Sequence, residues 1–220
     1  MTDKLMIFDC DGVLVDSEVL AAMAVCETLR DCGIDLEVDQ AINRYVGINM
    51  VSMLKKIEAE FARPLPIDFA GQIHANVNAI MVSKLNEIPG ISAALDQMNG
   101  PRCVASSSSL RGIRRSLRVT KLLHHFAEES IFSAEMVDNG KPAPDLFLYA
   151  AYKMGVPAQD CIVIEDSIPG VTGAVAAGMK VIGFTGGSHI RDGHNERLRA
   201  AGAQIVFDNM RSLPELVSGL

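Results

Sequence analysis

Chemically reactive side chains follow four separate runs of apolar residues in this chain of 220 residues. After the first run, Asp9 and Asp11 are two residues apart, so an extended backbone would place both carboxylates on one face. The later runs are followed by Ser106–Ser109, Gly140–Asp145 and Glu165–Ser167. The carboxylates of interest are those of Asp9, Asp11, Glu165 and Asp166.

These four carboxylates would repel one another by several kcal/mol at low effective dielectric if they met at one place. A divalent cation would relieve that repulsion, and Mg²⁺ commonly takes one or two carboxylates together with a substrate phosphate. The hydroxyl of Ser106 and the ammonium of Lys141 would add donors for phosphoryl oxygens. Because phosphoryl transfer depends mainly on positioning and charge neutralisation, the pattern predicts a magnesium-assisted phosphoryl site.

Short apolar runs alternate with helical patterns over most of the chain, which predicts a doubly wound parallel α/β sheet. The expected strands are Leu5–Phe8, Arg102–Ala105, Ser130–Ser133, Cys161–Ile164, Lys180–Phe184 and Gln204–Phe207. In such sheets, ligands bind beyond the carboxyl ends of the strands, which is where the reactive segments lie.

Between residues 15 and 86 the pattern is helical throughout, with no candidate strand. We therefore expect an α/β core made of residues 1–14 and 87–220, with an all-helical cap of residues 15–86 inserted after the first strand. Expected cap helices include Asp39–Tyr45, Met50–Phe61 and Ile67–Leu85. Two connections between cap and core suit a lid that closes by a hinge.

Composition and charge exclude several classes of function. A net charge of −7 argues against a nucleic-acid footprint, because phosphate-backbone binding requires clustered Lys and Arg. The longest charge-free stretch, Phe69–Ser83, is too short and polar to span a membrane. Five cysteines without C-x-x-C spacing, and no apolar signal sequence, favour the cytoplasm. The oligomeric state is not fixed by the sequence.

Taken together, the segments DCDGVLVDSE, VASSS, GKPAPD and IVIEDSIPGV resemble the motifs of the haloacid dehalogenase-like phosphohydrolase superfamily. The resemblance covers nearly the whole chain and includes the helical insert, which is similar to the small cap of that superfamily. Within it, the sequence resembles the branch of β-phosphoglucomutases and sugar-phosphate phosphatases, including 6-phosphogluconate phosphatase-like proteins. A small phosphorylated metabolite and Mg²⁺ are the substrate and cofactor that this resemblance implies.

The resemblance also implies roles for individual residues. Asp9 would attack phosphorus to form an aspartyl-phosphate, and Asp11 would protonate the leaving oxygen and later deprotonate water. Ser106 and Lys141 would hold the phosphoryl oxygens, with Ser107 as a neighbouring substrate contact.

The metal site that the resemblance implies lies at the same edge of the sheet, beyond the carboxyl ends of the strands. Asp9 and Asp166 would bind Mg²⁺ through their side chains, and Asp11 would bind it through its backbone carbonyl. Glu165 would be either a further ligand or a partner outside the metal's coordination shell.

Hydrolysis and phosphoryl transfer to a sugar both remain open. Mutases of this branch usually carry an Arg after the turn that corresponds to Tyr45–Asn49, where this chain has Met50, and a His early in the first cap helix, which is lacking here. We therefore favour a phosphatase. Gly47 and Asn49 in that turn, and Arg111 in the core, are the candidate substrate contacts.

A phospho-acceptor switch of the receiver type is a third interpretation, although receivers are shorter and have no helical insert. Two histidine segments have ordinary explanations: His124 and His125 are adjacent, which makes paired metal ligation improbable, and His189 and His194 are expected in a surface loop.

Overall fold

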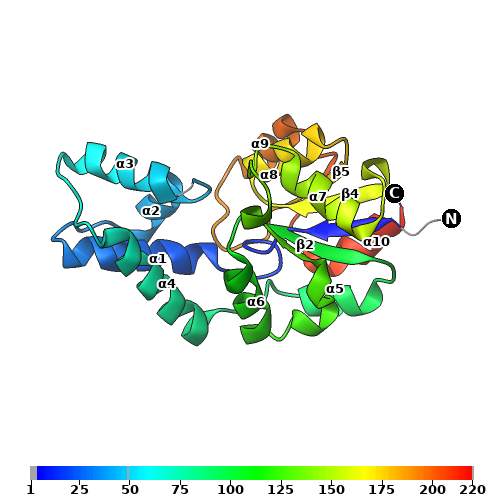
Figure 1. The fold of residues 1–220 in the computed structure, drawn as a ribbon, viewed down its shortest axis with the longest axis horizontal. Helices are drawn as coiled ribbons and strands as arrows, with labels where there is room; N and C mark the ends of the chain where they lie inside the picture. Colours follow the sequence, from blue (N-terminus) through cyan, green and yellow to red (C-terminus); the bar gives the residue numbers. More distant parts are fainter. Residues whose placement is uncertain (1–3, 49, 220) are drawn as a thin grey trace. The chain divides into compact units, whose positions relative to one another are not determined.

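The computed structural model describes residues 4–48 and 50–219 (Figure 1). Within these residues, six strands form one parallel sheet in the order β3-β2-β1-β4-β5-β6. The strands are β1 (Leu5–Phe8), β2 (Arg102–Ser106), β3 (Ile131–Ser133), β4 (Cys161–Glu165), β5 (Lys180–Phe184) and β6 (Ile205–Phe207). The predicted doubly wound parallel sheet is confirmed, and each expected strand is found with its limits within one residue.

The register of the central strands sets the position of the reactive residues. β1 is an uninterrupted apolar run, and all four of its residues are buried. Phe8 lies beside Val104 of β2 and beside Ile164 of β4. Asp9 therefore leaves β1 at the level of Glu165, the last residue of β4, and the side chains that follow neighbouring strands converge at one edge.

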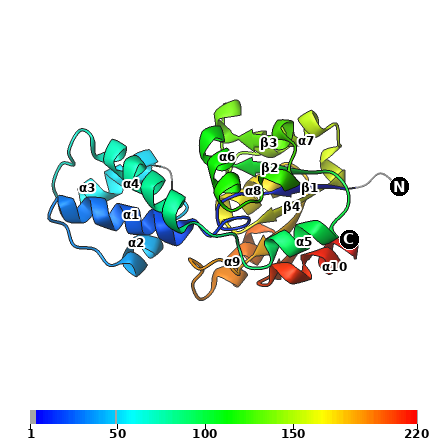
Figure 2. The ribbon, with the colours of Figure 1, turned by 90° about the horizontal axis from the view of Figure 1, so that it is seen from below.

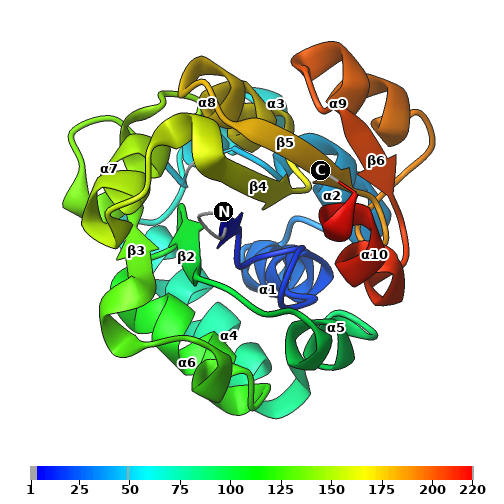
Figure 3. The same ribbon diagram turned by 90° about the vertical axis from the view of Figure 1, so that its right-hand side faces the viewer.

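Helices cover both faces of the sheet, and strands that are buried on both faces in this way are apolar on both sides. Figure 3 shows α5, α6 and α10 on one face and α7, α8 and α9 on the other. Helices α5 and α10 lie side by side (Figure 2). Leu5, Ile7 and Val163 of the strands share one buried core with Phe147 of α7 and Val171 of α8. The bounds are α5 (Ile91–Gln97), α6 (Leu110–Val119), α7 (Asp145–Met154), α8 (Ile168–Ala176), α9 (His194–Ala201) and α10 (Leu213–Ser218).

Residues Ser17–Leu85 form a second compact unit, in which the regular elements that the structure describes are all helices. Its helices are α1 (Glu18–Asp31), α2 (Val38–Tyr45), α3 (Met50–Phe61) and α4 (Phe69–Lys84). They enclose a core of their own, which includes Leu29, Ile57 and Ile73. The insert expected from the sequence, residues 15–86, is longer than this unit by two residues at one end and one at the other.

One helix of the first unit, α9, was not expected from the sequence. Its segment HNERLRAA buries only Leu198, so its apolar face is too narrow to give a helical period. Among the described residues, no helix is both long enough and apolar enough to cross a membrane.

Candidate active site

Three carboxylates converge at the carboxyl ends of the two central strands. Asp9 follows β1, Glu165 ends β4, and Asp166 comes next. One oxygen of each carboxylate lies within 4.8 Å of those of the other two, and all three residues are buried. They form a buried acidic cluster that could bind a metal ion.

The ammonium of Lys141 lies against this cluster. Lys141 is in the loop between β3 and α7, and its side chain is 4% exposed. Its Nζ donates to Oδ1 of Asp9 at 2.8 Å and to Oε1 of Glu165 at 2.7 Å. Burial by itself would lower the pKa of Lys141, but the two carboxylates outweigh burial and raise that pKa. Lys141 is therefore a cation at neutral pH.

Both carboxylate oxygens of Glu165 are engaged by the protein. Oε1 accepts from Lys141, and Oε2 accepts from the backbone N–H and the hydroxyl of Ser167 at 2.8 and 2.9 Å. Ser167 is the N-cap of α8, and its own hydroxyl oxygen accepts from Gly170 N at 3.1 Å. The start of α8 therefore fixes Glu165, which in turn fixes Lys141.

We expect Gly170→Ala to destabilise the protein, because a Cβ there would lie 1.7 Å from Oε1 of Glu165. Glu165 cannot move away without losing its bonds to Lys141 and Ser167. The expected loss is about 2–3 kcal/mol of unfolding free energy, measured by urea denaturation. Gly71→Ala in α4 is the control: no described atom beyond its own helix lies within 4 Å of that Cβ, and helix propensity predicts a gain of up to about 1 kcal/mol. Equal stabilities would contradict this prediction.

The side chain of Asp11 faces two serine hydroxyls at the carboxyl end of β2. Ser108 Oγ donates to Oδ2 of Asp11 at 2.6 Å, and Ser106 Oγ reaches the same oxygen at 3.4 Å. Ser106 is buried, and its hydroxyl oxygen also accepts from Ser108 N at 3.1 Å. Ser108 is thus the closer of these two hydroxyls to Asp11. The sequence offered four consecutive serines and no means of choosing among them.

Gly12 leaves the space that Asp166 occupies. The backbone of Gly12 has a φ of +78°, and a Cβ there would lie 1.9 Å from Oδ2 of Asp166. A larger residue would strain the backbone and also displace the carboxylate.

Asp166 also contacts two histidines from the segment after β5, so the expectation that His189 and His194 belong to a surface loop is wrong. His189 is 7% exposed, and its Nε2 lies 3.0 Å from Oδ2 of Asp166. His194 is the first residue of α9, and its Nε2 lies 2.5 Å from the backbone oxygen of Asp166. The position of these histidines in the sequence could have indicated the contact, because a segment that follows β5 must begin at the same sheet edge as Asp9.

The charges of the cluster are unbalanced in the absence of a further cation. Burial raises the pKa of Asp9 well above its usual value; Lys141 lowers that pKa, and Glu165 raises it again. Burial, followed by the charge of Glu165, raises the pKa of Asp166 well above normal. One ammonium faces three buried carboxylates, so a cation bound among the carboxylates would favour their ionised forms.

The structure gives only the local surroundings of the other residues predicted to contact substrate. Ser107 is exposed, and Arg111 is exposed on the first turn of α6. Gly47 belongs to the helical unit, where it follows α2 with a φ of +81°. Asn49 lies outside the described residues.

Comparison with known proteins identifies the family. Residues 6–184 match the haloacid dehalogenase-like hydrolase family. This chain belongs to that family. The chain is 30% identical over 214 residues to the 6-phosphogluconate phosphatase of Escherichia coli (strain K12), an alignment that covers 97% of this chain and 94% of that protein. The resemblance predicted from the four motifs is confirmed.

Two solved structures share the fold over the whole chain. A haloacid dehalogenase-like protein of unknown function from Agrobacterium tumefaciens str. C58 has a TM-score of 0.90 and 37% identity, with 100% of this chain and 99% of that chain covered. A haloacid dehalogenase-like family hydrolase from Deinococcus radiodurans R1, with bound phosphate and sodium, has a TM-score of 0.84 and 28% identity, with coverage of 99% and 96%. The chain is a hydrolase of this family, and its phosphatase relative supports phosphate monoesters as the substrate class.

Proposed function

We propose that this hydrolase is a Mg²⁺-dependent phosphatase that acts on a small phosphorylated metabolite, most simply a sugar or sugar-acid phosphate. The observation that carries the proposal is the buried contact of Lys141 with Asp9 and Glu165, beside Asp166. A carboxylate nucleophile, a fixed cation and an acidic metal site then lie at one sheet edge. The E. coli relative named for 6-phosphogluconate suggests the sugar-acid class.

In the first half-reaction, an oxygen of Asp9 attacks the phosphorus atom and the bond from phosphorus to the ester oxygen breaks. Lys141 orients Asp9 by its hydrogen bond to Oδ1, so the other oxygen is the one to attack. Protonated Asp11 gives its proton to the leaving oxygen, which departs as an alcohol. The product on the enzyme is an aspartyl-phosphate at Asp9.

In the second half-reaction, water attacks the phosphorus atom of the aspartyl-phosphate, and the bond from phosphorus to the Asp9 oxygen breaks. Asp11 takes the proton of that water and regains its original state. Ser108 and Ser106 donate to Oδ2 of Asp11, so they hold this acid and base in place between the two steps. Inorganic phosphate is released with Asp9 again ionised.

Asp9 and Asp166, with the backbone carbonyl of Asp11, are the residues that we propose hold Mg²⁺. When bound, the ion would neutralise the phosphoryl oxygens and the carboxylates together. Glu165 lies outside that set in this proposal, because Lys141 and Ser167 already engage both of its oxygens. Its role is to position Lys141.

The helical unit is proposed as the cap that selects the substrate, with Gly47, Asn49 and, from the core, Arg111 as candidate contacts. Its closure over the core and a cytoplasmic location both stay predictions.

The test is phosphate release from a panel that includes 6-phosphogluconate, phosphoglycolate and β-glucose 1-phosphate, with Mg²⁺ and with EDTA. We expect phosphate release that requires Mg²⁺ and returns when Mg²⁺ is restored after EDTA treatment. Glucose 6-phosphate formed from β-glucose 1-phosphate without free phosphate would instead identify a mutase. A stable phosphoryl label without turnover would identify a switch and overturn the proposal.

We expect His189→Ala to raise the Mg²⁺ concentration that gives half-maximal activity by about 10-fold to 100-fold. His189 contacts Oδ2 of Asp166, so its loss frees this carboxylate to adopt other orientations. The measurement is a Mg²⁺ titration of phosphate release at saturating substrate. His74→Ala, on the exposed side of α4, is the matched control and should leave the titration unchanged. An unchanged Mg²⁺ requirement in His189→Ala would mean that His189 does not position Asp166.

A further inference from the structure

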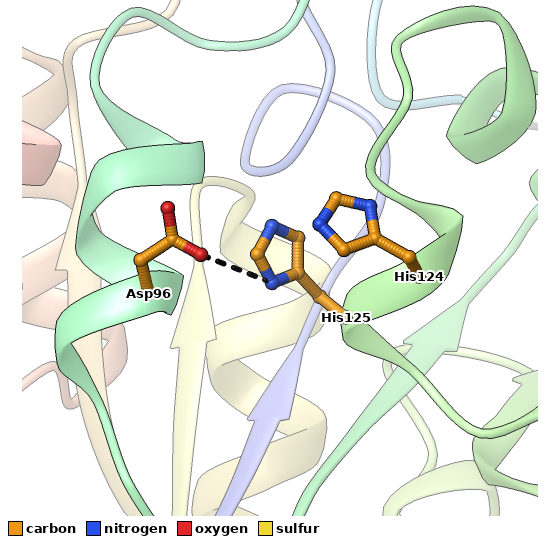
Figure 4. A group of neighbouring side chains, drawn as sticks. All are labelled: Asp96, His124 and His125. Carbon is orange, nitrogen blue, oxygen red and sulfur yellow. Dashed lines mark ion pairs between the residues drawn. The ribbon is translucent and has the colours of Figure 1, made fainter.

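A second group of potential metal ligands lies outside the acidic cluster at Asp9. Asp96 is near the end of α5, and His124 and His125 belong to the short 3₁₀ turn η1 (Leu123–His125). One ligand atom from each of the three residues lies within 4.8 Å of the other two. Figure 4 shows the carboxylate of Asp96 pointing toward the two imidazole rings from the neighbouring helix.

The tight turn brings two adjacent histidines together, which a regular helix would not do. Their ring centroids are 3.9 Å apart, with an interplanar angle of 37°. Nδ1 of His124 lies 2.7 Å from the backbone oxygen of Lys121. The carbonyl can only accept, so Nδ1 carries the hydrogen in this contact and Nε2 keeps its lone pair. Such a backbone hydrogen bond is typical of metal-binding histidines, because it fixes the tautomer and the ring orientation.

His125 is the buried member of the group. Its side chain is 6% exposed, and Nδ1 lies 3.9 Å from Oδ1 of Asp96. Within the described part of the chain, its buried Nε2 has no hydrogen-bond partner. Both ring nitrogens therefore lack the close partners that a purely structural buried histidine has.

We propose that Asp96, His124 and His125 form a site for a divalent transition metal of the Zn²⁺ type, with water completing its coordination. Zn²⁺ binds histidine nitrogen and carboxylate oxygen at about 2.0–2.2 Å, which places tetrahedral ligands about 3.4 Å apart. The present separations need a modest contraction. The side chain of Asp96 is 69% exposed, and His124 is exposed, so both can move toward the more fixed His125.

The donor types separate this site from the acidic cluster. Two imidazoles and one carboxylate suit Zn²⁺ and its neighbours in the first transition row, whereas Mg²⁺ prefers oxygen ligands alone. The nearby positive charge of Arg102 disfavours a cation at this site. The guanidinium of Arg102 is itself engaged, because it donates to the backbone oxygens of Leu95 and Met98. A bound ion would join α5 to η1 and so stabilise the folded chain.

The test is isothermal titration of the full chain with Zn²⁺ in the presence of millimolar Mg²⁺, with unfolding temperature as a second readout. The site variants are His124→Ala and Asp96→Asn, both at exposed side chains, and His74→Ala is the matched control. We expect wild type and His74→Ala to bind one equivalent of Zn²⁺, and we expect both site variants to lose this binding. Zn²⁺ should raise the unfolding temperature of wild type and His74→Ala only.

Wild-type protein that binds no Zn²⁺ under these conditions would overturn the proposal. So would an equivalent that both site variants retain, because the ion would then bind elsewhere. The Mg²⁺-dependent activity of the site variants, assayed without Zn²⁺, should match that of wild type, since none of the three residues belongs to the proposed catalytic machinery.

Discussion

Asp9→Asn is expected to lower the rate of phosphate release by about 10⁴-fold or more while leaving the protein folded. The asparagine amide has the shape of the carboxylate and can still accept from Lys141, so the local packing is kept. It has no anionic oxygen to attack phosphorus, and a covalent intermediate cannot form. The loss should therefore be seen in the rate at saturating substrate rather than in substrate affinity.

The measurement is steady-state phosphate release for Asp9→Asn and wild type, together with urea unfolding of both. Asp208→Asn makes the same chemical change at an exposed position after β6 and should leave the rate unchanged. Quenching the wild-type reaction in acid should trap phosphoryl label on the protein, and Asp9→Asn should trap none. A variant that retains more than a few per cent of the wild-type rate would exclude Asp9 as the nucleophile.

The central part of this site could be predicted from the sequence because short-range rules determine it. Apolar runs end where acids begin, and parallel strands align their carboxyl ends, so Asp9, Glu165 and Asp166 had to meet. The sequence pattern also placed Lys141 at this edge.

The parts that could not be predicted depend on contacts between distant residues or on local turn geometry. The contact of His189 with Asp166 depends on how the chain folds back after β5, and α9 has too few buried residues to show a period. The choice of Ser108 to contact Asp11 depends on the backbone turn after β2. The approach of His124 to His125 depends on a 3₁₀ turn that no periodicity in the sequence indicates.

Lys141→Met is expected to reduce both activity and stability. The ammonium is the cation that Asp9 and Glu165 share, and the Glu165 side chain is fully buried. Its removal leaves buried carboxylates without their partner, for which the expected loss is about 3–5 kcal/mol of unfolding free energy. We also expect at least a 10³-fold loss of phosphate release, because the ammonium that we propose stabilises the phosphoryl oxygens is lost with it. Lys153→Met, at an exposed position on α7, is the control for loss of a lysine.

Adding Glu165→Gln to Lys141→Met separates the two effects. The introduced glutamine amide is neutral, so burying it without Lys141 costs less free energy than burying the carboxylate. Its amide oxygen can still accept from Ser167, as Glu165 does. In a double-mutant cycle, we expect the second change to recover about 1–3 kcal/mol of stability. The rate should stay at the level of Lys141→Met, because no cation has been restored beside Asp9. Recovery of activity along with stability would mean that Lys141 acts only through folding, and the catalytic role proposed for its ammonium would have to be abandoned.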